Sequence, residues 1–452
     1  MLPKPSSCQG CPFYGTGQGF VPDELRPGTE VMVLGQNPGA QEEKDGKPFV
    51  WLTGQMMESK FLPLAGLDRS RISIGNAIRC RVNSANELPP LDQSECRAAV
   101  EHCTRAHLRV PEGARLVVAQ GAYALYALTG HGANKNDRIS DWRGWALALR
   151  PLDRTRTVSA SIYQPSPAEI TVLATLHLAA IFRDATLQHP TKHDWSRAAK
   201  LLAGKWPEPM PRIRFEPPLP GPHKYALPHL FALDTEFVPE TWRLIRYSLA
   251  WRLRDGEPVV HVVDGSDPSQ IVSLSARPRV IFHHTGADQD YADQLMPDGY
   301  DIEDTMHGHA VLWSDLDHDL GFLGSIYGRL NRWKHLDESS PLIYSGADAL
   351  VTYDAWCDWI APQFERDKQS EWVYRNLQLP LIGVIRRAGN LRVNQAVARQ
   401  ALAALEAKCE DAEARAQAAV GWPMNLGSGP QVVKQLYEIE RVHAQAKKGY
   451  RK

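Results

Sequence analysis

The stretch that most constrains the fold of this chain is Val31–Val50, which reads VMVLGQNPGAQEEKDGKPFV. It opens with four apolar residues, the length of a buried strand, and Gly35 and Pro38 then break the pattern and force a tight turn. A turn at the carboxyl end of a buried strand is where open α/β sheets bind ligands, and its N–H groups can hold an anion or an oxygen. Phe49 follows as an aromatic residue available for stacking. The stretch predicts a ligand site in an α/β domain, and the alternative is an ordinary strand-to-helix turn.

Size and composition bound the rest of the chain. At 452 residues it exceeds one ordinary domain, so two or three are expected. A net charge of −1 means that any basic surface must be local. No stretch approaches the roughly 18 uncharged apolar residues of a membrane span, and the N-terminus lacks the apolar core of a secretory signal. We therefore expect a cytosolic protein with no membrane partner, whose seven cysteines are metal ligands or free thiols rather than disulfides.

Five of these cysteines fall in the first quarter of the chain. Cys8 and Cys11 form a C-x-x-C, Cys80 stands alone, and Cys96 and Cys103 are one heptad apart on a helix expected over residues 92–108. No second C-x-x-C completes a zinc ribbon. Four scattered thiolates suit an iron–sulfur cluster, while a four-cysteine zinc site or a set of inert buried thiols are the alternatives. The two remaining cysteines, expected to pack in the core, are Cys357 and Cys409.

Taken together, these motifs resemble the iron–sulfur branch of the uracil-DNA glycosylases, families 4 and 5, over residues 8–206. The resemblance implies a three-layer α/β domain with a parallel sheet, uracil-containing DNA as substrate, and a [4Fe–4S] cluster on Cys8, Cys11, Cys80 and one cysteine of the next helix. The spacing from Cys80 favours Cys96. The spacing to the strand before Gly121 favours Cys103, which we assign. The segments that carry the resemblance are the C-x-x-C, GQNPG with PFV after it, NAIRCR, LVVAQG, Arg143-Gly144 and TLHLAAIFR.

The same resemblance assigns roles to individual residues. A glycosylase must take its base out of the duplex and read the Watson–Crick edge in a pocket. The side-chain amide of Asn76 can donate and accept at once, as that edge requires. His177 would stabilise the oxygen of the leaving uracil anion. The other residues implied are Gly35 in the binding turn, Phe49 stacking on uracil, and Gln36 and Asn37 positioning the attacking water.

Three departures from the family pattern bear on activity. Asn37 stands where the fastest branch has Asp, and an amide can orient water but cannot act as a general base. Trp51 replaces a usual glycine, and its bulk is expected to crowd the pocket. Leu178 replaces the proline of a His-Pro pair. These changes predict a slow glycosylase, and the alternative is a module that binds uracil or DNA without cleaving.

The middle of the chain brings together acidic residues. Residues 207–225 are rich in proline and are expected to form a linker. A strand then ends in Asp234-Thr-Glu236, which places both carboxylates on one face. Two adjacent acids are costly unless a cation neutralises them. Further along, Tyr344 and Asp348 are four residues apart and share a helix face.

This second set resembles the DEDD exonucleases of the tyrosine subclass, most closely the proofreading domain of family A DNA polymerases. The resemblance implies an RNase H-like fold over residues 226–365, acting on DNA 3′ ends, and the alternative is a metal-dependent RNase. Tyr344 would orient the attacking water, and His284, where the family usually has Asn, would contact the strand end. The residues implied to hold two Mg²⁺ or Mn²⁺ ions, about 3.5–4 Å apart, are Asp234, Glu236, Asp288 and Asp348.

The remaining residues, 366–452, are rich in helix-forming residues and resemble the start of a family A polymerase thumb. The chain stops before any palm, so polymerisation is not predicted, and a separate palm and fingers subunit would be the partner. A plain coiled arm is the alternative. The sequence thus predicts a glycosylase-like domain over 1–206, a linker, an exonuclease domain and a helical C-terminal arm. It would act in DNA repair or replication as the front of a phage-type polymerase, in a bacterial or phage-infected cell.

Overall fold

The structure is a computed structural model that describes residues 2–83, 88–133, 137–150, 170–216, 227–238, 240–264, 277–388, 395–421 and 435. The chain divides into two compact units, Met1–Ile382 and Gly383–Lys452. No helix within the described part of the chain has both the length and the apolar character that crossing a membrane demands.

The N-terminal part of the first unit is built on a five-stranded sheet in the order β2-β1-β3-β5-β4. Four strands run parallel and the edge strand β4 runs antiparallel to β5. Every residue of β1 is buried, as expected for a strand that is covered on both faces. The strands are β1 (Val31–Gly35), β2 (Ile72–Asn76), β3 (Leu116–Gln120), β4 (Ala146–Ala148) and β5 (Thr171–Thr175).

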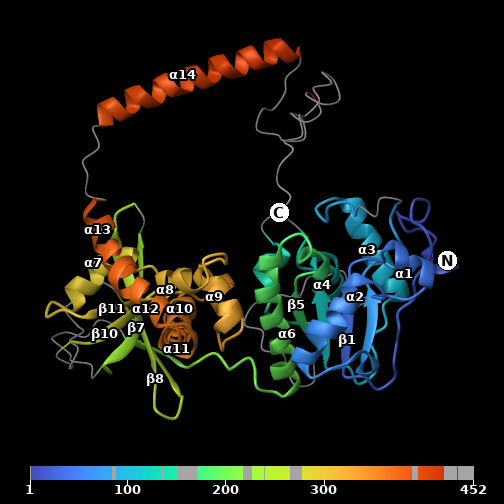
Figure 1. Ribbon diagram of the computed structural model, residues 1–452, viewed down its shortest axis with the longest axis horizontal. Coiled ribbons are helices and arrows are strands. Elements are labelled where there is room, and N and C mark those ends of the chain that lie inside the picture. The colour runs from blue at the N-terminus through green and yellow to red at the C-terminus, as the bar shows by residue number, and fades with distance from the viewer. Residues whose placement is uncertain are drawn as a thin grey trace. The chain divides into compact units, whose positions relative to one another are not determined.

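Helices cover both faces of this sheet, which gives the expected three layers (Figure 1). Alternate residues of β1 enter opposite cores: Met32 packs with α3 and α4, whereas Val33 packs with α6. The sequence periodicity of a two-sided strand therefore appears directly in the packing. The helices are α1 (Ala40–Asp45), α2 (Leu52–Met56), α3 (Ser94–His107), α4 (Ala122–Thr129), α5 (Ile139–Trp142) and α6 (Gln188–Leu202), with short turns η1 (Ser6–Cys8), η2 (Met57–Phe61), η3 (Leu62–Ala65), η4 (Arg69–Arg71), η5 (Leu178–Ala180) and η6 (Ala185–Leu187).

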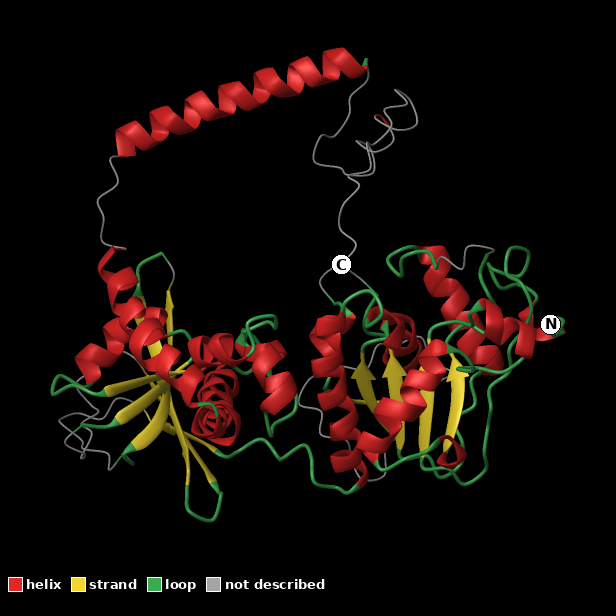
Figure 2. Ribbon diagram, in the orientation of Figure 1, coloured by secondary structure: helices red, strands yellow, loops and turns green. Residues whose placement is uncertain are grey.

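The second sheet has six strands in the order β11-β10-β7-β8-β9-β6 and mixes parallel with antiparallel pairs. Helix α7 packs on one face through Tyr291 and Leu295, and α10 packs on the other through Ala347. The strands are β6 (Ile213–Glu216), β7 (Leu230–Val238), β8 (Arg243–Arg252), β9 (Pro258–Asp264), β10 (Arg279–Phe282) and β11 (Asp301–Asp304). Figure 2 shows the two sheets in yellow.

The helical elements of the second part follow this sheet. Those expected over residues 313–333 include α9, which packs against α10. The elements are α7 (Thr285–Leu295), α8 (Thr305–Leu312), α9 (Leu320–Tyr327), η8 (Lys334–Leu336), α10 (Pro341–Ala355), η9 (Trp356–Ile360), α11 (Ala361–Arg366), α12 (Lys368–Val373), η10 (Tyr374–Gln378) and α13 (Leu379–Ala388).

The proline-rich stretch differs from the expected linker. Its described part, residues 207–216, contains β6, which pairs in parallel with β9 and extends the second sheet. The prolines at positions 207, 209 and 211 precede this strand, so they do not interrupt its ladder. Residues 217–226 lie outside the described part of the chain.

The C-terminal segment forms one long helix, α14 (Gln395–Val420). Its described side chains are almost all exposed, including Val397, Leu402 and Leu405. Cys409 is also exposed, so the expectation that it packs in a core is wrong. Residues 389–394 and nearly all that follow Gly421 lie outside the described part.

A buried ionic network joins the two sheet-bearing parts of the first unit. Asp194, on α6, is fully buried and accepts hydrogen bonds from the guanidinium of Arg143 and from Thr175 Oγ1 at 2.8 Å. Arg143 in turn donates to Ser325 Oγ on α9, at 2.6 Å. Arg197 donates to the carbonyls of Gly144, Gly324 and Gly328.

Removing the cation of this network will destabilise the protein. Arg143→Ala leaves Asp194 buried without its charged partner, which costs about 3–5 kcal/mol of unfolding free energy. The matched control is Arg115→Ala, because the ion pair of Arg115 with Glu30 is more than half exposed and is worth at most about 1 kcal/mol. Urea denaturation of the full chain, followed by tryptophan fluorescence, measures both. Equal losses in the two variants would contradict the assigned role.

Candidate active sites

Polar residues converge at the carboxyl edge of the first sheet. Strands β1, β2, β3 and β5 run in the same direction (Figure 2) and end at Gly35, Asn76, Gln120 and Thr175. Parallel strands bring their carboxyl ends to one edge, where α/β sheets form binding crevices. Phe49 and His177, from the loops after β1 and β5, lie over this edge with ring centroids 6.3 Å apart.

Gly35 is the residue that allows these groups to meet. A Cβ at this position would lie 2.5 Å from Asn76 Oδ1 and 2.6 Å from the Phe49 ring. Both distances are far inside van der Waals contact, so only glycine fits between the amide and the aromatic ring. At Gly121, which has a φ of 89°, a Cβ would lie 2.3 Å from Gln36 Nε2. The sequence predicted the turn at Gly35, and the structure gives the steric reason.

The loop that carries Phe49 is fixed by two charged residues. Phe49 has a φ of 53°, a conformation that side-chain-bearing residues seldom adopt. The Glu42 carboxylate accepts hydrogen bonds from the N–H groups of Gly39 and Phe49. Arg69 donates to the Phe49 carbonyl oxygen at 2.7 Å and also to the carbonyl of Pro48. These contacts hold the ring in place despite its strained backbone.

Two buried amides at this edge have unused hydrogen-bonding atoms. Asn76 is 2% exposed, and its Nδ2 has no partner among the described residues. Gln120 is fully buried and its Oε1 likewise has none. Buried polar atoms nearly always have partners, so an unpaired one marks a place for a ligand or water. The unpaired Nδ2 is consistent with the base-reading role expected of Asn76.

His177 is held as a neutral imidazole. Its Nδ1 accepts a hydrogen bond from the backbone N–H of Ala179 at 3.2 Å. An accepting Nδ1 leaves the proton on Nε2, which is then a donor. Burial, and to a smaller extent the charge of Arg183, lower the pKa of His177 to about 4. His177 is therefore uncharged at neutral pH.

The two bulky departures from the family pattern lie in different surroundings. Trp51 is 47% exposed, so about half of its side chain faces solvent. It is Gly54 that closes against the Phe49 loop, since a Cβ there would lie 1.9 Å from the Phe49 carbonyl oxygen. Leu178 is fully buried in the same core as Phe49 and Trp195. Leu178 thus packs beneath the loop as a core residue.

Four of the N-terminal cysteines line one pocket, together with Arg79 and His107: Cys8, Cys11, Cys80 and Cys103. Cys96 is not among them, since its sulfur contacts the Pro89 carbonyl and Tyr123 Oη instead. Arg79 is buried, pairs with Asp23, and donates to Cys103 Sγ at 3.8 Å. These four cysteines come from three segments that are distant in the sequence, and they line the same pocket.

Three carboxylates meet on one face of the second sheet. Asp234 and Glu236 on β7 and Asp348 on α10 offer oxygens that all lie within 4.8 Å of one another. Asp234 Oδ2 is buried and has no hydrogen-bond partner among the described residues. Burial and the nearby Asp348 and Asp288 carboxylates raise the pKa of Asp234 well above its ordinary value. An orphaned oxygen within an acidic group fits a divalent cation.

The fourth expected acid is placed differently. Asp288, on α7, is outside this group of three, and its carboxylate accepts hydrogen bonds from the backbone N–H and hydroxyl of Thr235. Burial raises the pKa of Asp288 to about 7. His284 adopts a φ of 68° at the start of α7, and its ring lies 6.3 Å from that of His307. The structure therefore brings together three of the four acids.

Residues that the sequence did not single out surround Asp348. Lys334 Nζ lies 2.9 Å from the Asp348 carboxylate and 3.2 Å from Tyr344 Oη. The indole N–H of Trp333 donates to Asp348 Oδ1. In the first site, Glu42 and Arg69 were also missed. Glu42 was a readable signal, because an acid three residues after the N-cap of a helix can accept from the N-cap N–H, as Glu42 does from Gly39. Lys334 and Trp333 gave no local signal, since their role depends on tertiary contact.

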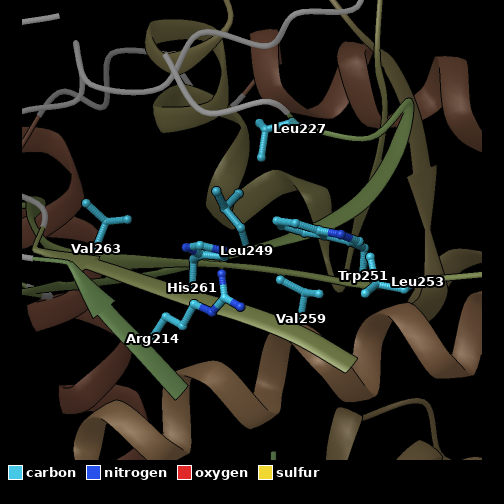
Figure 3. A pocket seen from close by; sticks show the side chains of 8 residues that line it. All are labelled: Arg214, Leu227, Leu249, Trp251, Leu253, Val259, His261 and Val263. Carbon is cyan, nitrogen blue, oxygen red and sulfur yellow. The ribbon is translucent and has the colours of Figure 1, made fainter. Parts of the chain in front are cut away.

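A separate cavity of about 320 Å³ lies on the other face of the second sheet (Figure 3). Trp251 and His261 line it with stacked rings, whose centroids are 5.4 Å apart. Successive side chains of a strand point to opposite faces of the sheet, so Trp251 and His261 lie on the face away from Ser248. Ser248 is the cross-strand partner of Asp234. This cavity is therefore not part of the acidic site.

The geometry of the first sheet defines a class of protein: a three-layer α/β domain with aromatic and amide side chains gathered at its strand ends. A family model described as the uracil DNA glycosylase superfamily matches residues 22–200, so the N-terminal part of the chain is a domain of that superfamily.

Curated relatives agree with this assignment. The chain is 25% identical over 197 residues to the type-4 uracil-DNA glycosylase of Sulfurisphaera tokodaii, covering 43% of this chain and 80% of that protein. It is 24% identical over 205 residues to the type-4 enzyme of Archaeoglobus fulgidus, covering 44% and 91%. With the type-4 enzyme of Thermotoga maritima the identity is 29% over 120 residues, covering 26% and 58%.

Neutralising one acid of the second site will stabilise the protein in the absence of divalent cations. The raised pKa of Asp234 means that its charged form is disfavoured in the folded state, so this group's contribution to stability falls as pH rises above its ordinary value. An uncharged Asn removes this penalty, so we expect Asp234→Asn to have a higher free energy of unfolding than the wild type at pH 8 in EDTA. Thermal unfolding measures the change, with exposed Asp315→Asn as control. A loss of stability in Asp234→Asn would contradict the like-charge account.

Proposed function

We propose that the N-terminal domain hydrolyses the N-glycosidic bond of uracil in DNA. The observation that carries the proposal is that Asn76 and Phe49 meet at Gly35, where a Cβ would collide with both, and that the His177 ring lies 6.3 Å from the Phe49 ring. The type-4 relatives, which are named for this activity, support it. The protein would then serve DNA repair as a hydrolase on uracil-containing DNA.

Each residue has a separate part in the reaction. Uracil, extruded from the DNA, stacks on Phe49 and presents its edge to the unpaired Asn76 Nδ2. Water forms a bond to the sugar C1′ while the bond from C1′ to the base nitrogen breaks, and the electron pair leaves with uracil. The proton that the water loses neutralises the released uracil anion. The Nε2–H of neutral His177 donates to the uracil oxygen on which the negative charge develops. The amides of Gln36 and Asn37 orient the water.

The cysteine-lined pocket supports a [4Fe–4S] cluster. Cys8, Cys11, Cys80 and Cys103 would hold it, and the set of four thiolates within one pocket fits that group. When bound, the cluster would cross-link the N-terminal loop to the segment after β2 and to α3. Buried Arg79 would place a fixed positive charge beside Cys103. Zinc on the same four thiolates is the alternative.

Substitution of single cysteines will distinguish the cysteines that bind the cluster from Cys96, which is not expected to bind it. Cys103→Ala removes one of the four convergent sulfurs and should lose the broad brown absorption band of anaerobically purified protein. Cys96→Ala is the matched control, because Cys96 lies on the same helix but contacts Pro89 and Tyr123, and it should keep the band. Loss of the band in Cys96→Ala alone would reject the assignment, and a colourless zinc-loaded wild type would reject the cluster.

His177→Ala will slow base release. Removal of one donor to the developing oxyanion typically costs about 10²–10³ in rate. Because the pKa of His177 is about 4, the wild-type rate should not change between pH 6 and 8 through this group. Alkali-sensitive nicking of a uracil-containing oligonucleotide measures both effects, with exposed His229→Ala as control. A wild type that binds uracil-DNA but releases no more base than His177→Ala would favour a non-catalytic binding module.

A second candidate function rests on the acidic site. We propose that the second part of the chain is a 3′–5′ exonuclease, supported by the orphaned Asp234 oxygen within the group formed with Glu236 and Asp348. These carboxylates would hold Mg²⁺ or Mn²⁺, with Asp288 contributing from its place beside Thr235. The ions would neutralise the phosphate and supply a hydroxide equivalent at neutral pH.

The chain's own residues complete the arrangement. Tyr344 lies one helical turn before Asp348, so both side chains face the same direction from α10. The Tyr344 hydroxyl would orient the attacking water. Lys334, between Tyr344 and Asp348, adds a cation that could meet the scissile phosphate. Water forms a bond to phosphorus as the bond to the 3′ oxygen of the preceding nucleotide breaks, and that oxygen takes up a proton.

Degradation of labelled single strands tests the nuclease. With Mg²⁺, the full chain should shorten a 5′-labelled DNA from its 3′ end, and Asp234→Ala should lower the rate by at least about 10³ because the remaining carboxylates cannot hold the ions in place. Asp315→Ala, on the surface, should behave as wild type. Intact DNA ends with the wild type, or equal shortening by Asp234→Ala, would reject the proposal. Faster loss of RNA than of DNA would instead identify an RNase.

For the C-terminal segment, the described residues support only a role in binding a protein partner. Helix α14 carries exposed apolar residues in its first half, namely Val397, Leu402 and Leu405. We propose that it is an arm for a protein partner, and a separate polymerase subunit is the candidate that the thumb resemblance suggests. Co-purification with a polymerase from the source cell, lost when Leu402 and Leu405 are both replaced by Gln, would support this assignment.

A further inference from the structure

One apolar core is shared by the glycosylase-superfamily domain and the acidic site. Trp145, which precedes β4 of the first sheet, is 3% exposed and belongs to a cluster with residues of the second part. Those residues include Ala347, Leu350 and Val351 of α10, the helix that carries Asp348. The first domain therefore supplies part of the packing against the helix of the acidic site.

Within this core, one aromatic pair connects Trp145 with a carboxylate. Trp145 meets Trp333 edge-to-face, with ring centroids 5.8 Å apart and planes at 87°. Trp333 is fully buried, and its indole N–H donates to Asp348 Oδ1. A single aromatic contact thus separates the first domain from an acid of the second site. Edge-to-face pairs have a preferred geometry, so the contact fixes the orientation of the indole.

The surrounding contacts hold this pair in place. A Cβ on Gly324 would lie 2.3 Å from the Trp333 ring, so α9 approaches the ring as closely as glycine permits. Asn331 donates to the Ala146 carbonyl at 2.8 Å and accepts from the Ala146 N–H at 3.2 Å. The guanidinium of Arg197 lies over the Trp145 ring, 5.3 Å from its centroid.

We propose that Trp145 is a positioning residue for the acidic site, acting across the domain boundary through Trp333 on Asp348. The inference rests on the proposed nuclease function, because it concerns the same carboxylates. Groups that orient metal ligands typically contribute about 10–100-fold to metal affinity. The N-terminal domain, for which we propose the glycosylase activity, is accordingly a structural part of the acidic site.

Binding of Mn²⁺ to the full chain tests the proposal, measured by the electron paramagnetic resonance signal of free Mn²⁺ without any substrate. Asp234→Ala defines the background. Trp333→Phe, which removes the N–H and keeps an aromatic ring, should weaken binding by about tenfold or more. Trp145→Ala should weaken it by at least about threefold, whereas Trp145→Phe, which retains an edge-to-face ring, should stay within about twofold of wild type.

Two further variants separate positioning from general instability. Leu128→Ala opens a cavity in the core of the first domain, away from Trp145, and should leave Mn²⁺ affinity unchanged. Asn331→Ala removes the two hydrogen bonds to Ala146 and should weaken binding by about two- to fivefold, so it decides the matter if Trp145→Ala does not fold.

The outcomes distinguish this inference from the function on which it rests. Wild-type affinity in Trp145→Ala, or in Asn331→Ala if Trp145→Ala does not fold, overturns the inference and leaves the proposed nuclease intact. Equal weakening in Leu128→Ala also overturns it, because the effect is then one of stability. A wild type that binds no more Mn²⁺ than Asp234→Ala rejects the metal site and the inference together.

Discussion

The structure depends on the buried carboxylate of Asp194, which lies on α6 and pairs with Arg143. Its other contact, Thr175, ends the strand that leads to His177. Arg197 donates to Gly324 and Gly328, at the carboxyl end of α9, where a helix favours positive charge. A charge removed from water must be compensated, so these residues can occupy only a narrow range of positions. The network therefore fixes the loop after β5, which carries a residue of the first site. It also fixes where α9, and with it the second sheet, packs against the first domain.

In both sites a glycine lets neighbouring groups come closer together than a residue with a Cβ would allow. At Gly35 the absence of a Cβ lets an amide and an aromatic ring occupy one small volume, and at Gly324 it lets α9 approach Trp333. In both cases the glycine has no side chain, so the neighbouring group packs directly against its backbone. Each site also contains a buried polar atom without a hydrogen-bond partner among the described residues, Asn76 Nδ2 in the first and Asp234 Oδ2 in the second. Unsatisfied atoms of this kind carry a free-energy cost that a bound ligand would relieve.

Much of the first domain could be predicted from the sequence, because its signals are local. The run before Gly35 predicted the strand and turn, whereas two spacings disagreed on the fourth cluster cysteine, one favouring Cys96 and the other Cys103. The placement of Asp288 beside Thr235 could not be predicted, since it depends on how α7 packs on β7. The strand within residues 207–216 was also missed, because proline content outweighed the short run that pairs with β9. Contacts such as Trp145 with Trp333 join residues far apart in sequence and have no local pattern.

The central proposal is that the residues at the strand ends of the first sheet bind a base taken out of DNA. The fluorescence of 2-aminopurine placed next to a uracil tests it most directly, because unstacking of the neighbouring base raises the signal. The account predicts a rise on adding the wild-type chain to uracil-DNA but not to thymine-DNA. It predicts no rise with Gly35→Ala, and an unaltered rise with Gly15→Ala, where an added Cβ meets nothing within 4 Å. No rise with the wild type, or an equal rise with Gly35→Ala, would contradict it.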